Sequence, residues 1–222
     1  EMQRSLVGSE MCIRDRLKSI GAYAFAGCIN LYDIELPNSL LHLEKYAFSG
    51  CKSLYTLKIP SKLQRISDYT FSKCISLTEI KIPGNIREIG YKSFSGCSGL
   101  REISIPSTVK TVGIGAFENC TELKDISLPT TLTEINYYTF SGCTSLTTLT
   151  LHSKLTAINN YAFAGCKSLT EIHCKNSNPP LIGENTFRDV NRIGCKIFVP
   201  SKRAKKSYST ALYWNEFTIY IE

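Results

Sequence analysis

The amino-acid sequence predicts a repeat solenoid: a curved stack of about eight coils with a parallel β-sheet on the concave face, turns and short helices elsewhere, and a C-terminal cap. Three observations lead to this prediction. Cysteine and phenylalanine recur every 23 residues, a pair of apolar residues two positions apart follows each cysteine, and a proline often closes the pair. A unit of this length cannot bury its own apolar side chains, so successive units must stack on one another.

The repeat runs through most of the 222-residue chain. Its cysteines are Cys28, Cys51, Cys74, Cys97, Cys120, Cys143 and Cys166. A phenylalanine lies three residues before each of these cysteines and a leucine three residues after it. One unit therefore reads L-x-x-I-x-x-x-A-F-x-x-C-x-x-L-x-x-I-x-I-P.

The apolar pair that ends each unit predicts a short β-strand. Two apolar residues separated by a polar one place both apolar side chains on the same face of a strand. Proline then ends the strand because it has no N–H for the ladder. The expected strands contain Ile34/Leu36, Leu57/Ile59, Ile80/Ile82, Ile103/Ile105, Ile126/Leu128, Leu149/Leu151 and Ile172/Cys174.

The pattern divides the chain into a repeat domain and two ends. Residues 17–200 form the repeat domain, with seven regular coils in 17–176 and an irregular last coil in 177–200. Residues 201–222 form the cap, in which we expect a short helix around 202–211. The residues that should cover the end of the core are Trp214, Phe217, Ile219 and Tyr220.

Residues 1–16 have no phase with the repeat and lack the apolar stretch of a signal peptide. We expect this segment to be extraneous or disordered, and therefore mobile and sensitive to proteases.

These motifs resemble the BspA-like, or treponemal-type, family of leucine-rich repeat proteins. The resemblance covers residues 17–202, and the Ala-Phe-x-x-Cys segment makes it specific because it is unusual among leucine-rich repeats. It implies that the L-x-x-I-x-I strands line the concave side and that the Ala-Phe-x-x-Cys segment turns back along the convex side. It also implies an adhesin-like role at the cell surface.

The cysteine column predicts buried, reduced thiols rather than a chemical site. No paired C-x-x-C or C-x-x-H spacing suited to a metal is present, and seven stacked cysteines cannot all pair. The sequence leaves open whether Cys174 and Cys195 form a disulfide. Such a bond requires the irregular coil to shift by about four strand residues, roughly 13 Å.

Catalysis has no support in the sequence, and we expect no catalytic residue, cofactor or metal. His42, His152 and His173 lie in three separate coils, and His173 should point to solvent from its strand. A net charge of +7 falls short of a dedicated nucleic-acid binder, and no apolar stretch is long enough for membrane insertion.

An acidic column on the strand face is the strongest candidate for binding. The outward residue that precedes each apolar pair is acidic in five of seven coils, at Asp33, Glu79, Glu102, Asp125 and Glu171. Like charges on neighbouring strands are destabilising. Either a basic partner offsets this cost, or Lys58, Lys81, Arg101 and Lys124 relieve it from flanking columns.

A tyrosine column two residues before the phenylalanines is the second candidate. It either binds a partner or shields the core, and it contains Tyr23, Tyr46, Tyr69, Tyr138 and Tyr161. A basic run at residues 202–206 lies in the expected cap helix, where we expect a solvated face.

The sequence therefore predicts a non-enzymatic protein-binding module of an extracellular or cell-surface protein. We expect a protein ligand from host matrix or a neighbouring cell, with no nucleic acid bound; the oligomeric state stays open. The alternatives are a structural spacer for a further domain, or a cytoplasmic interaction scaffold with reduced cysteines. The predicted binding residues are Tyr32, Tyr55, Lys58, Glu79, Lys81, Arg101, Glu102, Lys124 and Asp125.

Overall fold

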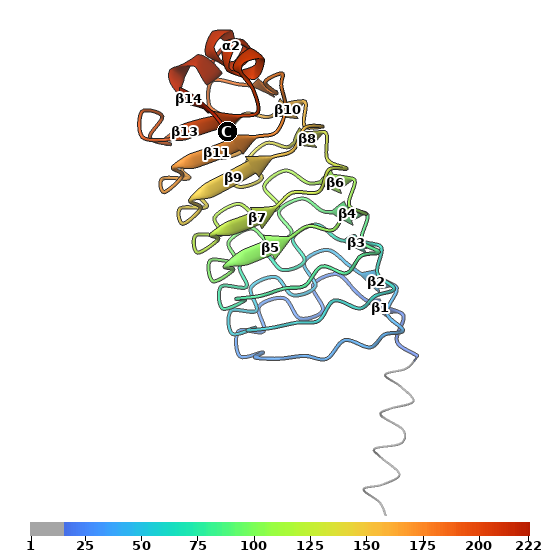
Figure 1. Ribbon diagram of the computed structural model, residues 1–222. Helices are drawn as coiled ribbons and strands as arrows, with labels where there is room; N and C mark the ends of the chain where they lie inside the picture. Colours follow the sequence, from blue (N-terminus) through green and yellow to red (C-terminus); the bar gives the residue numbers. More distant parts are fainter. Residues whose placement is uncertain (1–15) are drawn as a thin grey trace, which may run out of the picture.

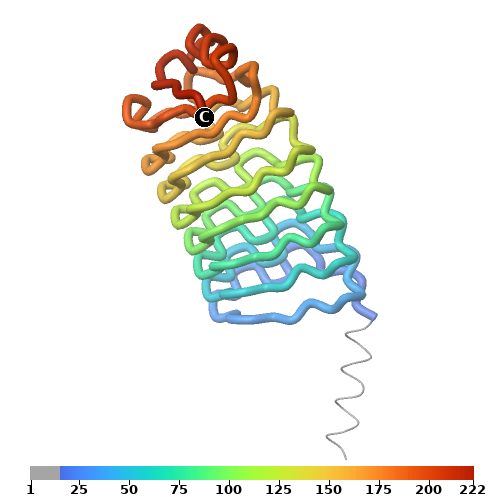
Figure 2. The backbone as a smooth tube through the Cα atoms, in the orientation of Figure 1, coloured from blue at the N-terminus to red at the C-terminus, as the bar shows by residue number. Residues whose placement is uncertain are grey.

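The structure is a computed structural model that describes residues 16–222, so the prediction for residues 1–16 falls outside it except at Arg16. The chain winds as a solenoid of stacked coils from the N-terminal side to a C-terminal cap (Figures 1 and 2). This confirms the predicted fold class.

Six longer strands run parallel to one another along the concave face. They are β5 (Glu102–Ser104), β7 (Asp125–Ser127), β9 (Thr148–Leu151), β11 (Glu171–Cys174), β13 (Lys196–Val199) and β14 (Thr218–Ile221). In β5, β7 and β9 the apolar residues point into the core and the polar residues point out, as the alternation predicts. We call the outward side of all six strands, together with the matching positions of the earlier coils, the strand face.

The first three predicted strands are wrong. Residues 34–36, 57–59 and 80–82 form no strand, and one isolated bridge joins Thr56 to Glu79. Proline alone does not explain the difference, because Pro106 and Pro129 occupy the same position after β5 and β7, which form with three residues each. Where Lys175 replaces the proline, its N–H donates to Leu151 O at 2.8 Å and the ladder reaches four residues.

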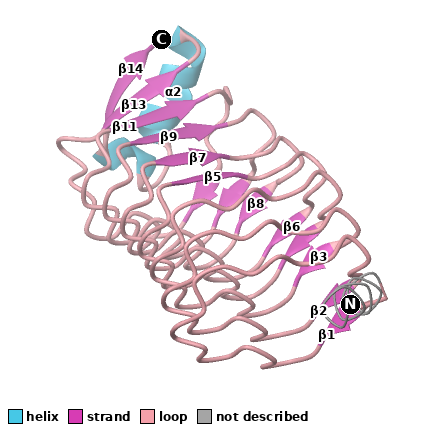
Figure 3. Cartoon of the chain, turned by 90° about the horizontal axis from the view of Figure 1, so that it is seen from below, coloured by secondary structure: helices cyan, strands magenta, loops and turns pink. Residues whose placement is uncertain are grey.

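A second set of parallel strands was not predicted. Each is two residues long, and Figure 3 shows the two sets separated by loops and turns. Six of the eight contain a single apolar residue, and two residues are too few to show alternation, which is why the set was not predicted. The strands are β1 (Ser19–Ile20), β2 (His42–Leu43), β3 (Arg65–Ile66), β4 (Glu88–Ile89), β6 (Thr111–Val112), β8 (Glu134–Ile135), β10 (Ala157–Ile158) and β12 (Leu181–Ile182).

The core is a column of stacked phenylalanine rings. Phe94 is fully buried, and its ring centroid lies 5.4 Å from that of Phe71 and 5.3 Å from that of Phe117. Phe25 in the first described coil stacks on Phe48 at 5.0 Å and is only partly buried. The difference arises because an internal coil has a neighbour on both sides.

The cap closes the C-terminal end of this column. Helix α2 (Lys202–Thr210) begins after Ser201, whose side chain accepts a hydrogen bond from Ala204 N, and the 3-10 helix η1 spans Trp214–Glu216. Trp214 and Phe217 meet the last ring, Phe187, edge to face. Their burial and that of Ile219 agree with the prediction, whereas Tyr220 points outward from β14 and is 41% exposed.

Candidate functional site

A groove of about 400 Å³ lies on the strand face in the middle of the solenoid. Three successive coils form it, the second through β5 and the third through β7. Its lining residues are Glu79, Ile80, Lys81, Ile82, Glu102, Ile103, Ser104, Pro106, Asp125, Ile126 and Ser127.

Three carboxylates line this groove in a row. Glu102 lies directly beside Asp125 in the parallel register, and Glu79 occupies the matching position one coil earlier. Neighbouring parallel strands lie about 4.8 Å apart, so the row carries like charges at close spacing. All three side chains are exposed, and none of them forms an ion pair with any described residue.

The basic residues of the flanking columns form no direct ion pair with this row. Lys58, Lys81, Arg101 and Lys124 are exposed and make no ion pair with another described residue. The groove is therefore locally acidic in a protein whose net charge is +7. An unpaired negative row on a basic protein favours a partner of positive charge.

The structure brings four of the nine predicted binding residues together in the groove: Glu79, Lys81, Glu102 and Asp125. Tyr32 and Tyr55 stack on each other with ring centroids 6.0 Å apart, but they lie outside the groove. Lys58, Arg101 and Lys124 also lie outside its lining.

Two hydroxyl groups of the groove were missed. Ser104 and Ser127 each lie two residues after a carboxylate, so strand alternation places them on the same face. That signal was present in the sequence. The groove therefore offers carboxylates on one side and hydroxyl donors on the other.

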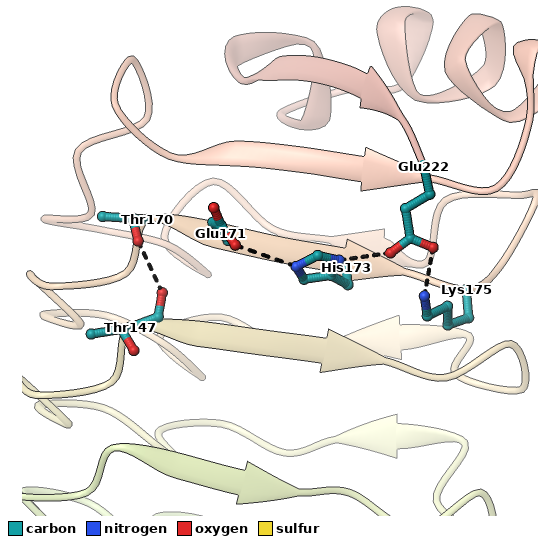
Figure 4. A network of polar contacts seen from close by, with 6 residues as sticks. All are labelled: Thr147, Thr170, Glu171, His173, Lys175 and Glu222. Carbon is teal, nitrogen blue, oxygen red and sulfur yellow. Dashed lines mark hydrogen bonds and ion pairs between the residues drawn. The ribbon is translucent and has the colours of Figure 1, made fainter.

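Towards the C-terminal end of the strand face, the carboxylates have hydrogen-bond and ion-pair partners within the protein (Figure 4). His173 Nδ1 lies 2.6 Å from Glu222 Oε1, and His173 Nε2 lies 3.5 Å from Glu171 Oε2. Lys175 Nζ donates to Glu222 Oε2 at 2.5 Å, and the hydrogen bonds from Lys175 and His173 lower the pKa of Glu222. Beside this network, Thr170 Oγ1 donates to Thr147 O.

His173 lies on the outward side of its strand, as expected, and these contacts hold its ring in place. Its ring also stacks on Phe198 at 4.9 Å, and Phe198 lies 5.7 Å from Tyr220. Glu171 and Glu222 are engaged within the protein, in contrast to the three carboxylates of the groove.

The tyrosine column is largely occupied by its own stacking. Tyr46 stacks on Tyr23 at 4.7 Å and on Tyr69 at 4.4 Å, and Tyr138 stacks on Tyr161 at 4.9 Å. These tyrosines share a positive φ of 55–63° that places them at the same turn of the coil. Since ring faces are buried against each other, this side offers a partner mainly ring edges.

Comparison with known proteins identifies the repeat family. The model of the BspA type leucine rich repeat region, with 6 copies, matches residues 8–120 and 88–211. The chain belongs to the BspA-type leucine-rich repeat family. No curated protein sequence matches the chain.

Solved BspA-type structures share the fold. A leucine-rich repeat protein from Bacteroides ovatus is 25% identical with a TM-score of 0.66, and the match covers 93% of this chain and 64% of that one. The leucine-rich repeat protein of T. pallidum is 31% identical with a TM-score of 0.63, covering 69% and 72% respectively. A protein from Eubacterium ventriosum is 29% identical with a TM-score of 0.64, covering 70% of this chain and 42% of that one.

The cysteines of this BspA-type solenoid form a hydrogen-bonded ladder. Each thiol from Cys51 to Cys166 donates to the phenylalanine carbonyl 26 residues earlier, as Cys97 Sγ does to Phe71 O at 3.0 Å. Burial raises the pKa of Cys97 to about 12. Cys28 is an exception to the predicted buried column: within residues 16–222 its coil packs only against the coil that follows, and the thiol is exposed.

Cys174 and Cys195 are both buried and free. His173 aligns with Phe198, so Cys174 lies beside Val199 and four strand positions from Cys195. The irregular coil does not shift, and no disulfide forms between them.

Within residues 16–222, no group of three or more His, Cys, Asp or Glu side chains is arranged to hold a metal ion. Over the same range, no helix is long and apolar enough to cross a bilayer.

Proposed function

We propose that this domain is a non-enzymatic protein-binding module that recognises a basic protein surface through the groove of the strand face. The observation that carries the proposal is the row formed by Glu79, Glu102 and Asp125, three carboxylates that share the groove with one lysine, Lys81, and form no ion pair with a described residue. A positively charged partner would remove the repulsion within the row. Strands β5 and β7 hold the backbone of Glu102 and Asp125 in register, and an isolated bridge holds that of Glu79, so little backbone entropy is lost on binding.

We further propose an adhesin-like role at the cell surface or in a secreted protein, with host matrix or a neighbouring cell supplying the partner. The BspA-type repeat supports this setting, because proteins of this type are often associated with the surface. The free cysteines do not argue for the cytoplasm. Those from Cys51 onward are buried, and desolvation keeps their pKa values high, which slows oxidation.

The test begins with binding to a panel of extracellular-matrix proteins. The affinity for any partner found is then measured for the wild type and for a triple variant that removes the row's charge at constant size. That variant is Glu79→Gln, Glu102→Gln and Asp125→Asn. A matched control removes three exposed carboxylates outside the groove: Glu44→Gln, Glu122→Gln and Glu184→Gln.

We expect the groove variant to lose at least about tenfold in affinity, because each charge pair at an interface contributes on the order of 1 kcal/mol. The control should retain binding, and salt should weaken the wild type because exposed charges are screened. A third variant, with Tyr46, Tyr69 and Tyr138 replaced by serine, should also retain binding. If the tyrosine variant loses affinity and the groove variant keeps it, the site lies on the other face.

A further inference from the structure

The C-terminal end of the solenoid carries the most exposed large apolar side chains of the described chain. Ile193 is 89% exposed, Leu181 is 78% exposed and Leu212 is 69% exposed. All three are aliphatic, and all belong to the last coil and the cap. Aliphatic side chains exposed singly are ordinary on protein surfaces, so these three indicate a binding surface only in combination with the charged residues of the same end.

The chain at this end is basic. Residues 191–216 contain six lysine or arginine residues and one acidic residue, Glu216, which pairs with Arg192. Four of the six lie on α2 and make no ion pair with a described residue: Lys202, Arg203, Lys205 and Lys206. Lys202 and Arg203 occupy the first turn of α2, where the helix dipole disfavours positive charge.

Contacts through η1 hold the three apolar residues at this end. Trp214 Nε1 donates to Pro180 O at 2.8 Å, which joins the segment of Leu181 to that of Leu212. Arg192 forms an ion pair with Glu216, which joins the loop of Ile193 to the same 3-10 helix. Figures 1 and 3 show α2 at the same end of the stack.

The chemistry of this end fits an anionic lipid surface better than a protein. Protein interfaces are centred on aromatic and arginine side chains that fill pockets, whereas these aliphatic residues protrude singly. Ala204 and Tyr208 on the apolar face of α2 are buried in the cap, so the helix supplies charge and the protruding residues supply apolar contact. Cations beside shallowly inserted apolar side chains are the usual means of peripheral membrane binding.

We propose that the C-terminal end docks peripherally on an anionic lipid bilayer, at the level of the headgroups and without a spanning segment. This surface is separate from the groove in the middle of the strand face, so a module bound to a membrane by its end would keep its groove open to a partner. The proposal does not depend on the function assigned to the groove.

The test is sedimentation of the protein with phosphatidylcholine vesicles, with and without phosphatidylglycerol. We expect binding to the anionic vesicles alone, and weaker binding as salt increases. Two variants separate the contributions of charge and apolar contact. The first replaces Lys202, Arg203, Lys205 and Lys206 by Gln, and the second replaces Leu181, Ile193 and Leu212 by Ser.

The charge variant should bind at least about a hundredfold more weakly, because each basic residue near an anionic surface contributes roughly fivefold. The apolar variant should lose about tenfold or more. A matched control changes the net charge by the same amount but replaces four exposed lysines elsewhere: Lys52→Gln, Lys62→Gln, Lys110→Gln and Lys167→Gln. Its affinity for anionic vesicles should stay within about threefold of that of the wild type, because these lysines lie away from the proposed contact.

Three results would overturn the proposal. The first is no binding of the wild type to anionic vesicles. The second is an equal loss in the control variant, which would show attraction by net charge only. The third is binding to soluble heparin as tight as to vesicles with no effect of the apolar variant, which would identify a dissolved polyanion as the ligand.

Discussion

The stacked phenylalanine column should make the cost of one substitution depend on where it is placed. Phe94→Ala removes a fully buried ring that stacks on two others, and we expect it to lower the free energy of unfolding by about 3–5 kcal/mol. Phe25→Ala removes the same ring from the first described coil, where it is partly exposed and stacks on Phe48 alone. Its cost should be about 1–2 kcal/mol, because less apolar surface and one stacked pair are lost.

Urea unfolding followed by circular dichroism measures both costs. If Phe94→Ala fails to fold, Phe94→Leu against Phe25→Leu gives the same comparison at a smaller volume change. The ordering of the two positions follows from nearest-neighbour stacking in a solenoid. Equal losses at Phe25 and Phe94 would refute this reasoning, because they would show that the first coil is packed as tightly as an internal one.

Three further predictions concern single residues. Iodoacetamide should label Cys28 rapidly in the folded protein and Cys97 only after denaturation, as peptide mass spectrometry would show; fast labelling of Cys97 would contradict the buried ladder. Gly113→Ala should lower the free energy of unfolding in urea by about 1–3 kcal/mol, because the new Cβ would lie 2.6 Å from Gly90 C in the neighbouring coil. Gly21→Ala, whose new Cβ would meet no atom within 4 Å, should leave that free energy nearly unchanged. Burial, and to a smaller extent Lys154, lower the pKa of His152 in the folded protein, so the unfolded chain binds more protons just below the ordinary histidine pKa of 6.5. The free energy of unfolding should therefore carry a contribution from His152 that is fully present above about pH 6.5 and is lost as the pH falls through the pKa of the folded state. This pH dependence, measured by urea unfolding, should be absent in His152→Asn.

The fold was predictable because its signal is local and repeated. Ile103 and Ile105 alternate with Ser104 within one coil, and the structure has a strand at Glu102–Ser104. The two-residue strands carry no such alternation, so the second set appeared only when the coils were stacked. Cys28 occupies the same position in its coil as the buried cysteines yet is exposed. Its burial depends on the coils packed against it and not on its position in the repeat.

The candidate site was predictable in part. The acidic column follows from strand alternation, and its members Glu79, Glu102 and Asp125 do line the groove. The pairing of His173 with Glu222 was not predictable, because the two residues are 49 positions apart and Glu222 lies outside the repeat. The period of the sequence shows which residues share a column, but only the packed side chains show which charges stay unpaired.

Carboxyl footprinting of the free and the partner-bound protein tests the central claim most directly. Carbodiimide labelling should modify Glu79, Glu102 and Asp125 readily in the free protein, because all three are exposed and unpaired. A bound partner should suppress the labelling of these three residues and leave Glu44 and Glu122, which lie outside the groove, unchanged. Undiminished labelling of all three groove carboxylates in the complex would contradict binding through the strand face.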